Sequence, residues 1–212
     1  MKKKMFAVTS AVLGLIASSA TAEDQQAADN LVNRAVHVCN KCHGEGGISS
    51  DPKVPSLAAQ QVAYLVEQQK LFRDQRRNEI SSEAYMWGIS ALLDDATIQG
   101  LADHYAAQKP PPGKPSSPKL AERGRKVYAR PIEVAKGKHK SCADCHGEQG
   151  EGATAIPRLA GQNAEYMLAQ LQKSFRTAAR PSAKVMTPVS HALSKEDMVA
   201  VTAYMQSLST GN

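Results

Sequence analysis

The 212-residue sequence is poor in aromatic side chains and, after its first 22 residues, has no long apolar run. A membrane-spanning helix needs about 20 consecutive apolar residues, so the body of the chain is not expected to cross a bilayer. Aromatic residues make up only 5% of the sequence. There are only four cysteines, and none lies near residue 22, which argues against a lipid-modified N-terminus.

The first 22 residues have the pattern of a cleaved leader. Lysines at positions 2–4 precede a largely apolar stretch over residues 5–17, and residues 20–22 form a small-x-small cleavage site. A retained anchor is the alternative, but the apolar stretch is shorter than the ~20 residues that span a bilayer. We therefore predict a signal peptide over residues 1–22 and a soluble mature protein, beginning near Glu23, in the periplasm.

The remaining sequence repeats itself after about a hundred residues, as a duplicated domain would. Each copy has a C-x-x-C-H-G motif followed by further matching positions. Among the matched residues are Cys39 and Cys142, Pro55 and Pro157, Gln60 and Gln162, Tyr64 and Tyr166, Arg77 and Arg180, and Met86 and Met186. Five prolines within residues 109–118 favour an extended connector between the copies. The predicted domains are residues 23–109 and 119–212, joined by a Pro-rich linker over residues 110–118.

Apolar residues in both copies recur at helical spacing. Leu31, Ala35, Val38 and Cys42 place the first cysteine motif at the end of an amphipathic helix. Further helices are expected over residues 60–73 and 162–176, and after the capping residues Asp94 or Asp95 and Ser194. No stretch alternates as a strand would, so the predicted fold class is all-α.

The C-x-x-C-H motif is the attachment sequence of c-type haem. On a helix, residues i and i+3 share a face, so both thiols can reach the two vinyl groups along one haem edge. A four-cysteine zinc site and two local disulfides are alternatives that leave the twinned histidines unexplained. A thioredoxin-like pair is a third alternative, but it needs a strand before a helix, which the sequence does not indicate. The motifs predict two covalently bound haem c groups, attached through Cys39 and Cys42 and through Cys142 and Cys145, with His43 and His146 as axial ligands of the two irons.

Two methionines are the predicted sixth ligands. Met86 and Met186 occupy matching positions, which we expect to be non-helical, before the last helix of each copy. A thioether ligand favours ferrous iron and raises the potential, which suits electron transfer. Met167, Met198 and Met205 are instead expected in the apolar core.

Prolines and arginines also recur with the motifs. A backbone carbonyl near Pro55 or Pro157 could accept the hydrogen bond from the second ring nitrogen of the ligand histidine. Arg73, Arg77, Arg176 and Arg180 recur in pairs and either contact haem propionates or are solvated helix charges.

Taken together, these motifs resemble the dihaem cytochrome c4 family. The resemblance rests on two C-x-x-C-H-G motifs, two P-x-L-A-[AG]-Q segments, each with a tyrosine four residues later, and a methionine before each last helix. It covers nearly all of residues 23–212, although Ala59 stands where glycine is more usual. It implies two tandem class I cytochrome c folds, His–Met ligation of both irons, and two haems close together across a pseudo-twofold domain interface.

The resemblance also implies an electron carrier that is not an enzyme. We expect a respiratory-chain donor such as a quinol-oxidising membrane complex, a terminal oxidase as acceptor, a monomer, and membrane association only through these partners. The alternatives are a cytochrome subunit of a flavocytochrome-type dehydrogenase and a dihaem peroxidase. A peroxidase would need an open iron site, whereas each copy offers a full His–Met pair.

Charge is divided unevenly between the copies. Residues 23–109 hold 8 Lys or Arg and 12 Asp or Glu, whereas residues 110–212 hold 15 and 8. Much of the positive charge lies just before the second haem motif, at Arg123, Arg125, Lys126, Arg130, Lys136, Lys138 and Lys140. Such a cluster can steer an acidic redox partner toward the nearby haem. Export argues against nucleic acid as the partner.

Overall fold

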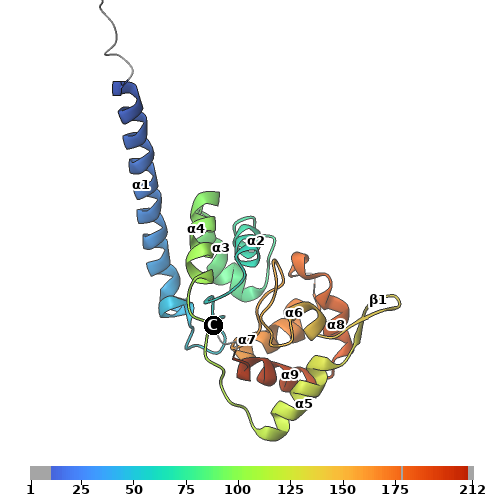
Figure 1. The fold of residues 1–212 in the computed structure, drawn as a ribbon. Helices are drawn as coiled ribbons and strands as arrows, with labels where there is room; N and C mark the ends of the chain where they lie inside the picture. Colours follow the sequence, from blue (N-terminus) through green and yellow to red (C-terminus); the bar gives the residue numbers. More distant parts are fainter. Residues whose placement is uncertain (1–10, 178, 210–212) are drawn as a thin grey trace, which may run out of the picture.

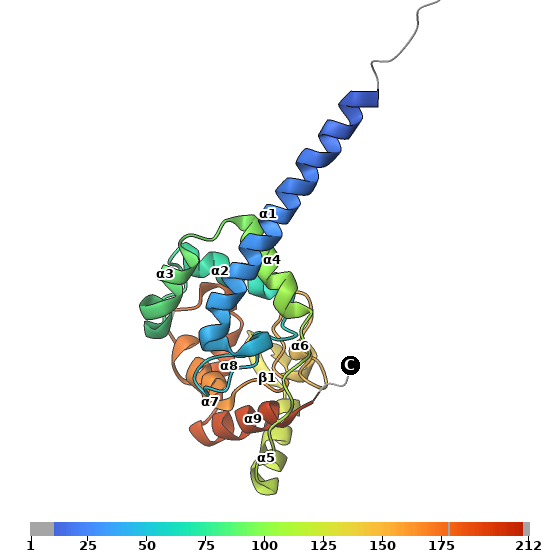
Figure 2. The same cartoon turned by 90° about the vertical axis from the view of Figure 1, so that its left-hand side faces the viewer.

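The computed structural model describes residues 11–177 and 179–209, and they are mostly helical (Figure 1). The helices are α1 (Ala11–His43), α2 (Val62–Arg73), α3 (Trp87–Ser90), α4 (Asp95–Ala106), α5 (Pro118–Ala129), α6 (Ala143–His146), α7 (Ala164–Ala169), α8 (Met186–Ala192) and α9 (Lys195–Ser207). Shorter turns of 3₁₀-helix are Glu45–Gly47 and Pro181–Ala183, and π-helical turns are Ser82–Met86 and Gln170–Ser174. The N-terminal part of α1 stands clear of the other helices (Figures 1 and 2).

The first copy is built around an apolar cluster between α1, α2 and α4. Its buried members are Val36, Leu65, Leu101, Ala102 and Tyr105. Helices α1 and α4 can approach closely because Gly100 has no side chain. A Cβ atom at this position would lie only 2.5 Å from Val32 Cγ2. The side chain of Cys39 packs against the edge of the same cluster.

The second copy has a larger cluster, in which α9 is the central helix. Its buried members are Val127, Tyr128, Ile132, Met167, Leu171, Val189, Leu193, Met198, Val201 and Met205. Helix α5 crosses α9 at Gly124, where a Cβ atom would lie 2.2 Å from the carbonyl oxygen of Ala200. The prediction that Met167, Met198 and Met205 are core residues is confirmed.

The two predicted helix caps are also present. The Asp94 carboxylate accepts a hydrogen bond from the Thr97 backbone N–H at 2.7 Å, and the Ser194 hydroxyl accepts one from the Asp197 N–H at 3.0 Å. Each cap satisfies one of the free N–H groups at the start of a helix. Helices α4 and α9 therefore begin where local side-chain chemistry predicts.

The predicted apolar face of the first helix is only partly correct. Ala35 packs against the core, but Leu31 and Val38 are 41% and 55% exposed, and Val32 and Val36 contact the core in their place. Both sets have helical spacing, so periodicity alone cannot choose between them. The prediction that the first cysteine motif ends this helix is nevertheless correct, because α1 ends at His43.

A small β-hairpin was not predicted. Strands β1 (Ile132–Ala135) and β2 (Lys138–Lys140) pair antiparallel between α5 and α6 and extend away from the body of the second copy (Figure 1). Only Ile132 of these strands is buried, so the segment lacks the apolar alternation that reveals a strand. The first copy has no such insertion, since α1 continues directly into its cysteine motif.

The predicted signal peptide and the predicted linker can each be compared with the structure. The predicted signal peptide lies partly outside the described residues, which begin within it at Ala11. In the described residues no helix is both long enough and apolar enough to traverse a bilayer. The residues from 109 to 117 contain no helix or strand, and α5 begins at Pro118, the last residue of the predicted linker.

Candidate haem-binding sites

The first candidate site lies at the C-terminal end of α1. Cys39 and Cys42 are one helical turn apart, and the His43 ring that follows is buried. Gly44 ends the helix with a φ of 81°, and a Cβ atom there would overlap the carbonyl of Ile48. The glycine of the C-x-x-C-H-G motif is therefore required for the chain to turn away immediately after the histidine.

The second site repeats this arrangement on α6. Cys142 directly precedes the short helix, Cys145 lies one turn later, and His146 is the last residue of the helix and is buried. Gly147 has a φ of 85°, matching Gly44. Cys142 and Met186 both pack against the apolar cluster around α9, so this copy brings a motif cysteine and its predicted methionine ligand to one cluster.

Both histidines make the same hydrogen bond. His43 Nδ1 lies 2.8 Å from the Pro55 carbonyl oxygen, and His146 Nδ1 lies 2.9 Å from that of Pro157. A carbonyl only accepts, so each Nδ1 carries a proton and each Nε2 is left with its lone pair. Burial lowers the pKa of both histidines, which keeps the rings neutral. The predicted hydrogen bonds to the proline carbonyls are present, and each ring keeps the lone pair on Nε2 available for a metal ion.

The predicted methionine ligands lie in helical turns, which corrects the expectation of non-helical positions. Met86 is the last residue of the π-helical turn Ser82–Met86, and Met186 is the first residue of α8. Both side chains are partly buried. Single π-helical turns often occur at functional sites, because they offset one side chain from the regular helical face. The neighbouring Trp87 donates its indole N–H to the Arg77 carbonyl at 2.8 Å, which fixes the turn beside Met86.

None of the four cysteines is paired in a disulfide, so all four are available for haem attachment. Burial raises the pKa of Cys39, and it raises that of Cys142 to about 11, so both favour the protonated form. Among the described residues, no three His, Cys, Asp or Glu side chains come together to hold a metal ion.

This chain is similar to known proteins over most of its length. The chain is 35% identical over 181 residues to cytochrome c4 of Azotobacter vinelandii, covering 81% of this chain and 84% of that one. It is 34% identical over 209 residues to cytochrome c-552 of Acidithiobacillus ferridurans, covering 98% of this chain and 89% of that one. This chain belongs to the cytochrome c4 family. It is accordingly an electron carrier with two covalently bound haem c groups, and this membership indicates a periplasmic location.

Comparison of the folds agrees with this cytochrome c4 assignment. The crystal structure of reduced recombinant cytochrome c4 from Pseudomonas stutzeri matches with a TM-score of 0.73 and 30% identity. The match covers 86% of this chain and 98% of that one. Residues 121–209 also match the Cytochrome c family.

Two buried arginines have N–H groups that could bind the negatively charged propionates of a haem. Arg158 is 7% exposed, and its Nε and Nη2 atoms have no hydrogen-bond acceptor among the described residues. Arg180 Nε likewise has no hydrogen-bond acceptor there, because Glu79 is 3.8 Å away. Buried guanidinium N–H groups without acceptors fit the carboxylates of haem propionates. Of these two arginines, only Arg180 was predicted from the sequence to contact a propionate. Arg73, which was also predicted to do so, is instead paired with Asp95 at 2.7 Å.

The two copies meet through a cluster that joins Arg77 and Arg180 to a single carboxylate. Glu79 lies 2.9 Å from Arg77 Nε and 3.8 Å from Arg180 Nε. Arg180 donates to the Tyr64 hydroxyl of the first copy at 2.7 Å, and Arg77 donates to the Tyr166 hydroxyl of the second at 3.4 Å. Each arginine therefore bridges to a tyrosine of the other copy.

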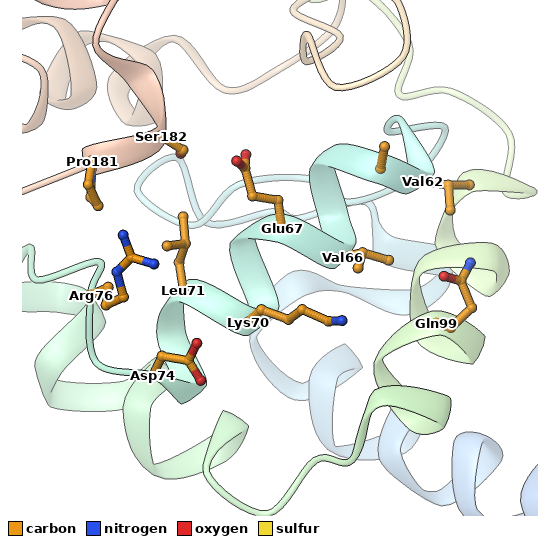
Figure 3. Close-up of a pocket in the computed structure, with 11 residues that line it drawn as sticks. Val62, Val66, Glu67, Lys70, Leu71, Asp74, Arg76, Gln99, Pro181 and Ser182 are labelled. Atoms are coloured by element: carbon orange, nitrogen blue, oxygen red, sulfur yellow. The ribbon is translucent and has the colours of Figure 1, made fainter.

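A surface groove beside α2 is a different feature. It lies between α2 and the turn at Pro181 and Ser182, and it is lined by Glu67, Lys70, Asp74 and Arg76 among others (Figure 3). None of the predicted haem-binding residues lines it. The groove has side chains of both charges and no Cys, His or Met among its lining residues. We therefore interpret it as a gap between the two copies and not as a haem pocket.

We predict that Glu79→Gln destabilises the protein by about 3 kcal/mol at pH 7, because two buried guanidinium groups lose their carboxylate. Burial alone would raise the pKa of Glu79, but Arg77 and Arg180 outweigh it and hold that pKa below its usual range. This stabilisation is complete above the unfolded pKa of about 4.3 and is lost as pH falls through the folded pKa.

The measurement is the free energy of unfolding of the haem-loaded protein in urea at pH 7 and at a series of lower pH values that extends well below the unfolded pKa. The difference between wild type and Glu79→Gln should shrink as the pH falls through the lowered pKa of Glu79, and the exposed Glu83→Gln should change little at any of these pH values. A loss that stays the same over the whole series would show that the charge of Glu79 is not what stabilises the interface.

Proposed function

We propose that each copy binds its haem through its own cysteine pair and carries one electron through its own His–Met pair. Cys39 and Cys42, and Cys142 and Cys145, form the thioether bonds, with His43 and Met86 on one iron and His146 and Met186 on the other. When bound, each haem supplies an iron that accepts and releases an electron. The observation that carries the proposal is the pair of buried histidines, each held by a proline carbonyl with Nε2 free.

The protein's own residues set the conditions for electron transfer. The proline carbonyls fix the tautomer and orientation of each histidine, so the ligand does not have to reorganise when the iron changes oxidation state. The methionine thioethers favour the ferrous state and raise the potentials. The buried arginines offset the negative charge of the propionates, which also favours ferrous iron.

We further propose that the chain works in the periplasm after removal of residues 1–22, as domains 23–109 and 119–212 joined by the linker 110–118. Two separate apolar clusters, one before and one after residue 109, support this division. The proposed donor is a quinol-oxidising membrane complex, and the proposed acceptor is a terminal oxidase.

The β-hairpin before the second haem motif is the proposed docking surface for an acidic redox partner. Arg123 and Arg130 are paired with Asp197, and Arg125 and Lys126 with Glu122. Lys136, Lys138 and Lys140 are exposed and form no ion pair within the described part of the chain. Within this basic cluster the unpaired charge therefore lies on the hairpin, whose strand β2 lies next to α6 and its haem motif.

The ligand assignment predicts that Met86→Leu and Met186→Leu each lower one of two reduction potentials. Each variant should also remove about half of the near-infrared sulfur-to-iron absorption, because one of two thioethers is lost. Potentiometric titration and near-infrared spectra of the oxidised protein measure both effects. Met205→Leu is the matched control and should change neither; if it has the effect and the other two do not, the ligands are misassigned.

The docking surface predicts that Lys136→Glu, Lys138→Glu and Lys140→Glu together slow electron transfer to an acidic partner about tenfold at low salt. The rate of oxidation by membranes from the source bacterium is measured across ionic strength. It should converge on wild type near 1 M salt, where the Debye length is ~3 Å. Lys109→Glu, Lys119→Glu and Lys195→Glu make the same charge change at exposed positions elsewhere and should slow the reaction much less. An unchanged low-salt rate in the hairpin variant would remove the hairpin as the docking face.

A further inference from the structure

One peptide group in each copy is hydrogen-bonded on both sides, and its two partners come from different copies. In the first copy this group joins Pro55 to Ser56. Its carbonyl oxygen accepts from His43 Nδ1 at 2.8 Å, and its N–H donates to Gln162 Oε1 at 2.9 Å. A glutamine of the second copy is therefore connected to the histidine of the first through a single amide.

The second copy has the equivalent arrangement at the peptide group between Pro157 and Arg158. Its carbonyl oxygen accepts from His146 Nδ1 at 2.9 Å, and its N–H donates to Gln60 Oε1 at 2.8 Å. Gln60 belongs to the first copy. The two connections thus cross the interface in opposite directions.

Each glutamine is held in the orientation that this arrangement needs. Gln162 Nε2 donates back to the Ser56 carbonyl at 2.8 Å, and Gln60 Nε2 donates to the Arg158 carbonyl at 3.1 Å. Both glutamine side chains are buried. In each glutamine both the oxygen and the nitrogen of the side-chain amide are hydrogen-bonded, and the side chain is shielded from water. A water molecule therefore cannot take over these hydrogen bonds unless the interface changes.

Hydrogen bonds in such a chain strengthen one another. An acceptor on the N–H of an amide increases the negative charge on its carbonyl oxygen, with an effect of about 10–30% per bond in a buried setting. A stronger carbonyl acceptor makes the histidine ring more electron-rich and a better ligand. A more basic ligand favours ferric iron and lowers the potential.

We propose that Gln60 and Gln162 are positioning residues that act across the interface on the opposite copy's haem ligand. Gln162 strengthens the hydrogen bond of His43, and Gln60 strengthens that of His146. This inference rests on the proposed function, because it takes both histidines as iron ligands. It gives each copy of the protein a contribution to the potential of the other copy's haem.

The test compares Gln162→Leu and Gln60→Leu in the haem-loaded, reduced protein. Proton NMR with ¹⁵N-labelled histidine measures the Nδ1 proton of each ligand, and potentiometric titration measures both potentials. Gln162→Leu should move the His43 Nδ1 proton upfield and raise one potential, leaving His146 in place. Gln60→Leu should do the same to His146 and raise the other potential.

Two further variants separate this effect from simple loosening of the interface. Gln61→Leu removes a neighbouring hydrogen bond between the copies, from Gln61 Nε2 to the Glu151 carbonyl at 2.9 Å, and should move neither proton. Gln162→Glu keeps an oxygen to accept from the Ser56 N–H and should not move the His43 proton upfield. It tests the same position with a side chain of nearly the same size if Gln162→Leu does not accumulate.

The possible outcomes are distinct. If each leucine variant shifts the histidine of its own copy, shifts both equally or shifts neither, the crossed connection is wrong. If Gln61→Leu reproduces the shifts, the effect is a general response to interface damage and the proposal is overturned. If the wild-type spectrum lacks the ring-current shifts of a haem-bound His43 or His146, it is the ligand assignment that has failed.

Discussion

The structure depends on two hydrogen bonds, those from His43 and His146 to the carbonyls of Pro55 and Pro157. They hold two buried imidazole rings neutral, with Nε2 free, in the helical turn that carries the thiols. The N–H of each of these two peptide groups donates a hydrogen bond to the side-chain oxygen of a glutamine in the opposite copy. The segment that orients each ligand therefore also joins the copies, so that neither haem site can be described without the other half of the chain.

Charge at the interface is arranged less symmetrically than the backbone. Arg77 and Arg180 are matched residues, but they share one carboxylate, that of Glu79, and position 182, which matches Glu79, is a serine. Arg158 is also unmatched, because its counterpart is Ser56. Buried charge without a full set of partners is costly unless an anion completes it, and the haem propionates have the required charge. The buried charges of the two copies therefore differ.

The parts of the fold set by local chemistry could be predicted from the sequence, as could much of the site. The haem motifs, the proline carbonyl acceptors, the caps at Asp94 and Ser194 and the core methionines all follow from short-range spacing. The phase of α1 could not, because two overlapping sets of apolar residues have helical spacing. The hairpin at Ile132–Ala135 and Lys138–Lys140 was missed because its mostly exposed, lysine-rich strands carry no apolar alternation. Glu79 and Arg158 were missed because comparison of the copies reveals only residues that recur.

That each copy carries its own covalently attached haem is tested most directly by intact mass spectrometry of the exported protein after denaturation. Wild type should carry two haem additions, and replacing either cysteine pair, Cys39 with Cys42 or Cys142 with Cys145, by alanine should remove one addition and leave the other. A single addition in wild type, or loss of both additions from either double variant, would contradict independent attachment in the two copies.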